Sequence, residues 1–102
     1  MKYLIIAKPG TTPMPAVQGA DILQAARAWM RAKLEDGTVE VTYNFFGGGG
    51  FGIVNARSHE ECLQNLLEIP IYPFFEWEVK PILDFEGSYD LFIPFYQKLG
   101  SM

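Results

Sequence analysis

Residues 38–54 have the sequence TVEVTYNFFGGGGFGIV, which contains the strongest strand signal in the chain. Residues 38–45 alternate between apolar and polar side chains, which predicts a half-buried β-strand. The apolar set, expected to face the core, is Val39, Val41, Tyr43 and Phe45, and the polar set is Glu40, Thr42 and Asn44. Glycines follow and then a second apolar run from Phe51 to Ala56. Since glycine supplies the positive φ of tight hairpin turns, the stretch predicts a β-hairpin.

The same glycines also match the nucleotide-binding pattern G-x-G-x-x-G, at Gly47, Gly49 and Gly52. A dinucleotide site needs a helix directly after the glycines, because the helix N-terminus holds the pyrophosphate. Here a strand follows, and the next helix is expected only near Ser58. A kinase glycine-rich loop needs further motifs that a chain of 102 residues cannot hold. The pattern therefore indicates a hairpin, with nucleotide binding as an alternative to be tested by thermal stabilisation with ATP or NAD.

Helices and strands alternate on both sides of this hairpin. Apolar residues recur at three- and four-residue steps from about Val17 to Asp36, which predicts an amphipathic helix. Ser58 and Glu61 have the spacing of a capping box and predict the start of a second, shorter helix. Further strands are expected over 3–7 and 74–79. The predicted order β-α-β-β-α-β is the ferredoxin-like α+β plan, an antiparallel sheet with two helices on one face.

The chain is expected to form one domain over residues 1–83 with an aromatic extension over residues 84–102. Aromatic residues make up 15% of the sequence, which is much to bury in a single small monomer. The extension is too apolar to remain in water. We expect it to pack on its own subunit or on a neighbouring one.

Charge and composition argue against several classes of protein. The formal net charge is −4, and no cluster of Lys and Arg is present, which argues against nucleic acid or anionic membranes as partners. No run is long enough to span a bilayer or to act as a signal peptide, so we expect a soluble, cytoplasmic protein. The single cysteine, Cys62, excludes an internal disulfide and a cysteine-based metal site, and no metal-ligand spacing is present.

Residues 66–79, LLEIPIYPFFEWEV, resemble the muconolactone isomerase family, in which a similar proline-spaced run precedes alternating apolar and acidic residues. The cap at Ser58 with Glu60, and the turn Asp36-Gly37-Thr38, are also similar. The resemblance implies a ferredoxin-like domain that pairs sheet to sheet as a dimeric α+β barrel, and larger rings of such dimers. It further implies an inter-subunit pocket that isomerises a small unsaturated lactone without a cofactor.

The chain departs from this family at two places. The family carries a functional glutamate on the first helix, where counting back from Gly37 places Ala26. It also carries a histidine in the hairpin, where this chain has glycine. Two hypotheses therefore stay open. One is a cofactor-free isomerase acting on a small unsaturated lactone or an aromatic-derived acid in an inter-subunit pocket, and the other is a non-catalytic small-ligand-binding or assembly module on the same fold.

Proton transfer needs a carboxylate or an imidazole in a dry pocket. Glu76 and Glu78 lie on one face of the predicted last strand and are the candidate catalytic pair, with solvation or ion pairing by lysine as the alternative. The candidate ligand-binding side chains are Tyr43, Asn44, Tyr72 and Trp29. His59, the only histidine, is expected at the surface, and Cys62 is expected to be a small buried hydrophobe.

Overall fold

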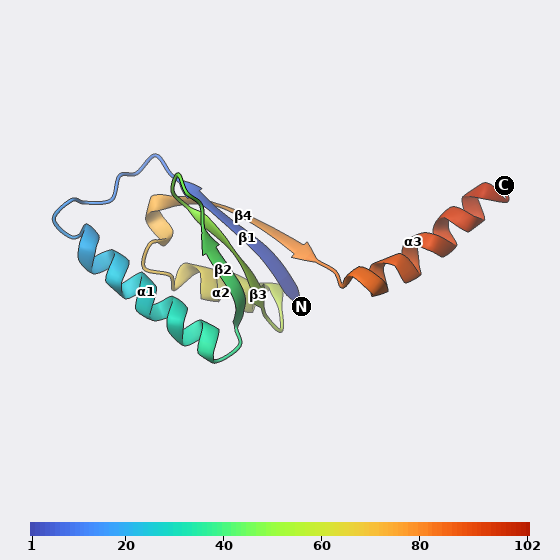
Figure 1. The fold of residues 1–102 in the computed structure, drawn as a ribbon, viewed down its shortest axis with the longest axis horizontal. Helices are drawn as coiled ribbons and strands as arrows, with labels where there is room; N and C mark the ends of the chain where they lie inside the picture. The colour runs from blue at the N-terminus through green and yellow to red at the C-terminus, as the bar shows by residue number, and fades with distance from the viewer.

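The computed structural model of the protein describes residues 1–102. The elements are β1 (Lys2–Pro9), α1 (Gly19–Glu35), β2 (Val39–Asn44), β3 (Gly50–Asn55), α2 (His59–Leu67), a 3-10 turn η1 (Tyr72–Phe74), β4 (Phe75–Ile82) and α3 (Phe85–Gly100). The first six helices and strands follow the predicted order β-α-β-β-α-β, so the ferredoxin-like α+β fold is confirmed, with α3 added at the C-terminus (Figure 1).

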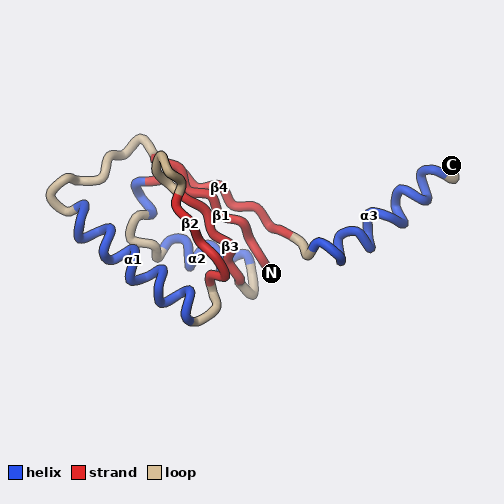
Figure 2. The backbone as a smooth tube through the Cα atoms, viewed as in Figure 1, coloured by secondary structure: helices blue, strands red, loops and turns tan.

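The four strands form one antiparallel sheet in the order β2-β3-β1-β4 (Figure 2). Strand β1 is central, because it pairs with β3 on one side and with β4 on the other. Alternate residues of β1, namely Tyr3, Ile5 and Ala7, are buried. Figure 1 shows α1 and α2 on the same side of the sheet. We call this side the helical face and the opposite, uncovered side the open face.

The core on the helical face is small. It consists of Tyr3, Ile5, Val39, Val54, Ala56, Cys62, Leu66 and Ile69. Helix α2 contributes Cys62 and Leu66 to it, which confirms the expected role of Cys62. Helix α1 has no buried residue, and only Trp29 and Met30 pack partly against the core. Helix α1 therefore contributes less buried surface to the core than α2 does.

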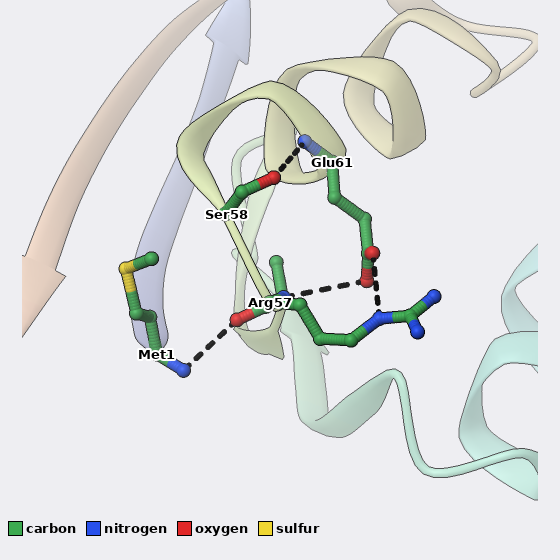
Figure 3. Close-up of polar contacts among 5 residues, drawn as sticks. Met1, Arg57, Ser58 and Glu61 are labelled. Carbon is green, nitrogen blue, oxygen red and sulfur yellow. Dashed lines mark hydrogen bonds and ion pairs between the residues drawn. The ribbon is translucent and has the colours of Figure 1, made fainter.

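Short-range contacts of neighbouring residues fix the position where α2 begins. The hydroxyl oxygen of Ser58 accepts a hydrogen bond from the backbone N–H of Glu61 at 3.1 Å, as the capping pattern predicts (Figure 3). The carboxylate of Glu61 turns back to the Arg57 guanidinium, with a distance of 3.0 Å between Oε2 and Nε. The N-terminal ammonium of Met1 donates to the carbonyl oxygen of Ala56 at 2.9 Å. These contacts tie the start of α2 to the start of β1.

The hairpin between β2 and β3 is present, so this prediction is confirmed. Gly48 and Gly49 have φ values of 108° and 78°, which only glycine adopts easily. Strand β3 follows directly, and α2 begins at His59. No helix N-terminus therefore adjoins the glycines, as a dinucleotide site would require.

The predicted alternation of β2 is wrong beyond Val39, because the strand contains a β-bulge. Val39 pairs with Val54, but Val41 pairs with Ile53, so Glu40 is an extra residue. The bulge turns Val41 and Tyr43 to the open face, and the Tyr43 side chain is 64% exposed. It also separates the polar set that was expected to lie together. Thr42 and Asn44 face the helices, and Glu40 remains on the open face beside Lys2 and Asn55.

Helix α3 extends away from the rest of the molecule (Figure 1). The Asp84 carboxylate caps it by accepting from the backbone N–H of Gly87 at 3.1 Å. None of its residues is buried, and the molecule is 64 Å long as a result. None of the helices combines the length and the apolar character that crossing a membrane requires.

Candidate functional site

A cavity of about 370 Å³ lies on the helical face, between α1, α2, the sheet and the β2–β3 hairpin. Fifteen of its 22 lining residues are hydrophobic. Helix α1 contributes Leu23, Trp29 and Met30, and the sheet contributes Ile5, Ala7, Val39, Val54 and Trp77 among others. Such a mostly apolar hollow with a few polar groups is typical of small-molecule sites, which start at about 300 Å³.

Two glycines of β3 leave room for this cavity. Gly50 and Gly52 pair with Ala7 and Ile5 of β1, so both lie on the helical face. A methyl group on Gly50 would meet the Tyr43 carbonyl oxygen at 2.5 Å, so the backbone itself requires glycine there. A methyl group on Gly52 would make only ordinary contacts, the nearest to the Val41 carbonyl oxygen at 3.4 Å. Gly52 is therefore not required by the backbone, and its missing side chain enlarges the cavity.

Three polar side chains line the cavity: Thr42, Asn44 and Asn65. The Thr42 hydroxyl donates to the Phe51 carbonyl oxygen at 3.0 Å. The side-chain amides of Asn44 and Asn65 make no hydrogen bond within the chain, so they are free to bind an oxygen atom of a ligand. No ionisable side chain lines the cavity. Its chemistry therefore suits an uncharged, mostly apolar ligand with a few polar atoms that the two amides can hydrogen-bond.

Of the six predicted site residues, the structure brings two into this cavity. Trp29 and Asn44 line it. Tyr43 lies on the open face because of the bulge. The ring of Tyr72 stacks on Trp77 with centroids 5.9 Å apart, and the Tyr72 carbonyl oxygen accepts from Trp77 Nε1 at 3.0 Å. Tyr72 thus supports a wall residue of the cavity without lining it.

The predicted catalytic pair lies on the other side of the sheet. Glu76 and Glu78 pair with Lys8 and Ile6 of β1, and both side chains face away from the helices. The Glu78 carboxylate lies 3.1 Å from the Lys80 ammonium, and both groups are exposed. Within one chain the sheet therefore separates the two glutamates from the cavity, and their catalytic role remains a prediction.

Among the lining residues that were not predicted from the sequence are Thr42, Gly52, Asn65 and Trp77. The bulge reverses the direction of the Thr42 side chain relative to the one that regular alternation predicts. Asn65 did carry a signal, because it occurs between Cys62 and Leu66 on the apolar stripe of α2, where a polar side chain is out of place. Trp77 was assigned to the correct face but not to a site.

Tyr3 and His59 form a polar contact near the N-terminus, and neither residue lines the cavity. The Tyr3 hydroxyl is hydrogen-bonded to Nδ1 of His59 at 2.5 Å. His59 is exposed, as predicted, whereas Tyr3 is buried. Burial, with smaller effects of Cys62 and Glu60, raises the pKa of Tyr3. Burial also raises the pKa of the Cys62 thiol, and this disfavours a nucleophilic thiolate.

Comparison of the sequence with protein-family models and with curated proteins gives no match. Comparison of the fold with solved structures does find similar proteins. A crystal structure of muconolactone isomerase matches with a TM-score of 0.73 and 14% identity, over 82% of this chain and 90% of that chain. The protein has a muconolactone isomerase-like fold.

A second solved structure has the same fold. It is the 5-chloro-2-hydroxyhydroquinone dehydrochlorinase TftG from Burkholderia phenoliruptrix AC1100, in complex with 2,5-dihydroxybenzoquinone. The TM-score is 0.66 and the identity 19%, over 85% of this chain and 98% of that chain. At these identities the comparisons establish the fold, which agrees with the resemblance seen in residues 66–79.

Proposed function

We propose that the protein binds a small, uncharged, unsaturated ring that carries oxygen atoms, of the size of a lactone or a quinone, in the cavity between α1 and the sheet. The observation that carries this proposal is the apolar cavity of about 370 Å³ with the free amides of Asn44 and Asn65 in its wall. The names of two proteins with this fold support the ligand class. One is an isomerase of a lactone, and the other was solved with a dihydroxybenzoquinone.

The lining suggests how such a ring is held. The indoles of Trp29 and Trp77 offer flat apolar surfaces, which suit a planar ring. The amides of Asn44 and Asn65 offer N–H donors to its carbonyl or hydroxyl oxygens. A carboxylate ligand would lack a cationic partner in the lining, so we expect neutral rings to bind more tightly than their acids.

Catalysis is a second candidate function. The isomerase hypothesis needs an acid or a base beside the substrate, and the cavity lining supplies none. The glutamates Glu76 and Glu78 meet this need only if a second copy covers the open face and removes their carboxylates from water. Under this hypothesis the protein is a cofactor-independent isomerase whose substrate lies between two subunits.

The proposed partner for the open face is therefore a second copy of the chain. The centre of this face is apolar, with Leu4, Ile6, Val41, Phe51 and Ile53 half-buried and Tyr43 exposed. Charged groups stand at its edge: Lys2 with Glu40, and Glu78 with Lys80. An apolar centre with a polar rim is the usual anatomy of a protein interface.

The binding proposal is tested by filling the cavity from Gly52. We expect Gly52→Ala to weaken the binding of a lactone or quinone, and Gly52→Leu to lower affinity by at least about 100-fold, because the added side chain occupies the ligand space. Isothermal calorimetry with a panel of unsaturated lactones and hydroxyquinones measures the affinity, and circular dichroism checks the fold.

Gly47→Ala is the matched control, since a methyl group there would meet nothing within 4 Å and Gly47 does not line the cavity. Equal affinity in the wild type and in Gly52→Leu would contradict the proposed site. So would an absence of binding to every ring in the panel.

A further inference from the structure

The mouth of the cavity is rimmed by apolar side chains that lie in water. Phe45, Phe46 and Leu23 line the cavity and are nonetheless exposed. The two phenylalanines belong to the β2–β3 hairpin, and Leu23 belongs to α1. The exposed fraction of Phe46 is 111%, so nothing in the chain covers its ring. A hydrated phenyl ring at the edge of an apolar cavity is stabilised by turning inward, because burial removes its surface from water.

The turn that carries Phe46 has a fixed base. A methyl group on Gly49 would lie 2.2 Å from the Ala7 carbonyl oxygen, so the backbone of the turn packs directly on β1. The Phe45 N–H donates to the Gly49 carbonyl oxygen at 2.8 Å and joins the two sides of the turn. Figure 1 shows this turn at the end of the sheet where β1 ends. The base therefore holds the turn in place beside the cavity.

The tip of the turn, residues 46–48, has few contacts. A methyl group on Gly47 would meet nothing within 4 Å, and one on Gly48 would meet only the Pro9 side chain at 3.5 Å. One backbone hydrogen bond closes the tip, from the Gly48 N–H to the Phe45 carbonyl oxygen at 3.1 Å. Glycine adopts φ values of either sign readily, so Gly48, with a φ of 108°, can absorb a rotation of the tip on its fixed base.

We propose that Phe46 is a lid residue, which turns inward and covers a ligand bound in the cavity. This inference rests on the proposed ligand site and adds the residue that closes it. Without a ligand, a ring turned inward borders a hollow of about 370 Å³ and lacks contact atoms on that side. A bound ring supplies those contacts. Closure of the lid and binding of the ligand therefore stabilise each other.

A protein partner that covers Phe46 is the other explanation for its exposed ring. Apart from Phe46, the tip offers a partner no side chain, because residues 47–50 are all glycine. One phenyl ring is far smaller than the roughly 800 Å² that each partner contributes to a standard interface. The apolar cavity, in contrast, lies directly beside the ring. The position of Phe46 therefore favours a lid over a protein contact.

Fluorine NMR and binding kinetics test the lid with coumarin, a neutral unsaturated lactone. A single para-fluorophenylalanine at position 46 of the full chain reports the surroundings of this ring, and we expect its resonance to shift when coumarin saturates the protein. Phe46→Ala should raise the dissociation constant of coumarin about tenfold, because the buried surface of the phenyl ring is lost. The dissociation rate should account for this rise, since a lid mainly retains a bound ligand. Stopped-flow fluorescence of Trp29 and Trp77, which line the cavity, measures both rates. Phe46→Leu keeps an apolar cover and should restore most of the affinity.

Leu63→Ala is the matched control, because it also removes an exposed apolar side chain, but from α2 and outside the cavity lining. It should leave both rates unchanged. Three results would overturn the lid and leave the ligand site intact: equal affinity of the wild type and Phe46→Ala for coumarin, an unshifted fluorine resonance at saturation, or a loss of affinity in Phe46→Ala that occurs only together with a fall in the sedimenting mass. If neither coumarin nor any other ring in the panel binds to the wild type, the ligand site and the lid both fail.

Discussion

At the scale of single residues, Glu40 decides which side chains reach the cavity. As the extra residue of the bulge it reverses the direction of the side chains after Val39, and this turns Thr42 and Asn44 toward the helices. Its own carboxylate stays on the open face, 2.8 Å from the Lys2 ammonium, and accepts a hydrogen bond from Asn55 Nδ2 at 3.1 Å. Alternation alone cannot reveal such a bulge, because the sequence pattern is regular on both sides of it.

The polar contacts of Glu40 predict how the stability of the protein depends on pH. Hydrogen bonds from Lys2 and Asn55 lower the pKa of Glu40 below its ordinary value of 4.5. The ionised form is therefore favoured in the folded chain, and its stabilising effect is present above pH 4.5 and lost as the pH falls through the lowered pKa. We expect Glu40→Gln to melt at a slightly lower temperature than the wild type at pH 7, and the difference to vanish in acid.

Thermal melts at a series of pH values measure this difference. Glu86→Gln is the control, because Glu86 takes part in no ion pair and should show little difference at any pH. A wild-type advantage over Glu40→Gln that is the same in acid as at pH 7 would show that the effect does not come from ionisation.

At the scale of elements, the β2–β3 hairpin depends on a glycine that no other residue can replace. Gly49 has a φ of 78°, and a methyl group on it would lie 2.2 Å from the Ala7 carbonyl oxygen. We expect Gly49→Ala to lower the free energy of unfolding by about 3 kcal/mol or more, because strain in φ and a backbone clash add up. Urea denaturation measures this change in the free energy of unfolding.

Gly47→Ala serves again as the control, since that position is open and has no positive φ. It should change stability by less than about 1 kcal/mol. If the two variants unfold at the same urea concentration, the close approach of the hairpin to β1 is not what requires glycine at position 49.

Most elements could be predicted from the sequence because their signals are local. The glycines of the hairpin and the cap at Ser58 act within a few residues, and both predictions are confirmed. The cavity could not be predicted, because it lies between α1, α2 and the β2–β3 hairpin, and no local pattern encodes how these elements are arranged in space. The helical form of α3 was also missed, since Gly87 and Pro94 weaken the helix signal and its apolar residues occupy too wide an arc to show clear periodicity.

At the scale of the whole molecule, a single chain leaves two apolar surfaces uncovered: the open face and α3. Only 10 of its 102 residues are buried, which is few for a domain of this size. The two surfaces lie on different elements, so a change in one need not affect the other. We therefore expect assembly to supply much of the stability, and the catalytic hypothesis depends on it, since Glu78 is exposed in one chain.

This dependence gives the last prediction. If two open faces meet, Ile53→Lys places a charge in the apolar centre, and we expect the dimer dissociation constant to rise by at least about 100-fold. If the enclosed Glu78 is the base, Glu78→Gln should abolish turnover of any lactone that the protein isomerises while leaving the mass unchanged, and Ile53→Lys should lower turnover and mass together. Leu63→Lys is the control, because Leu63 is an exposed residue of α2 on the other side of the sheet. Full turnover in Glu78→Gln would remove this residue from the mechanism, whereas an unchanged mass in Ile53→Lys would show that the open face is not the interface.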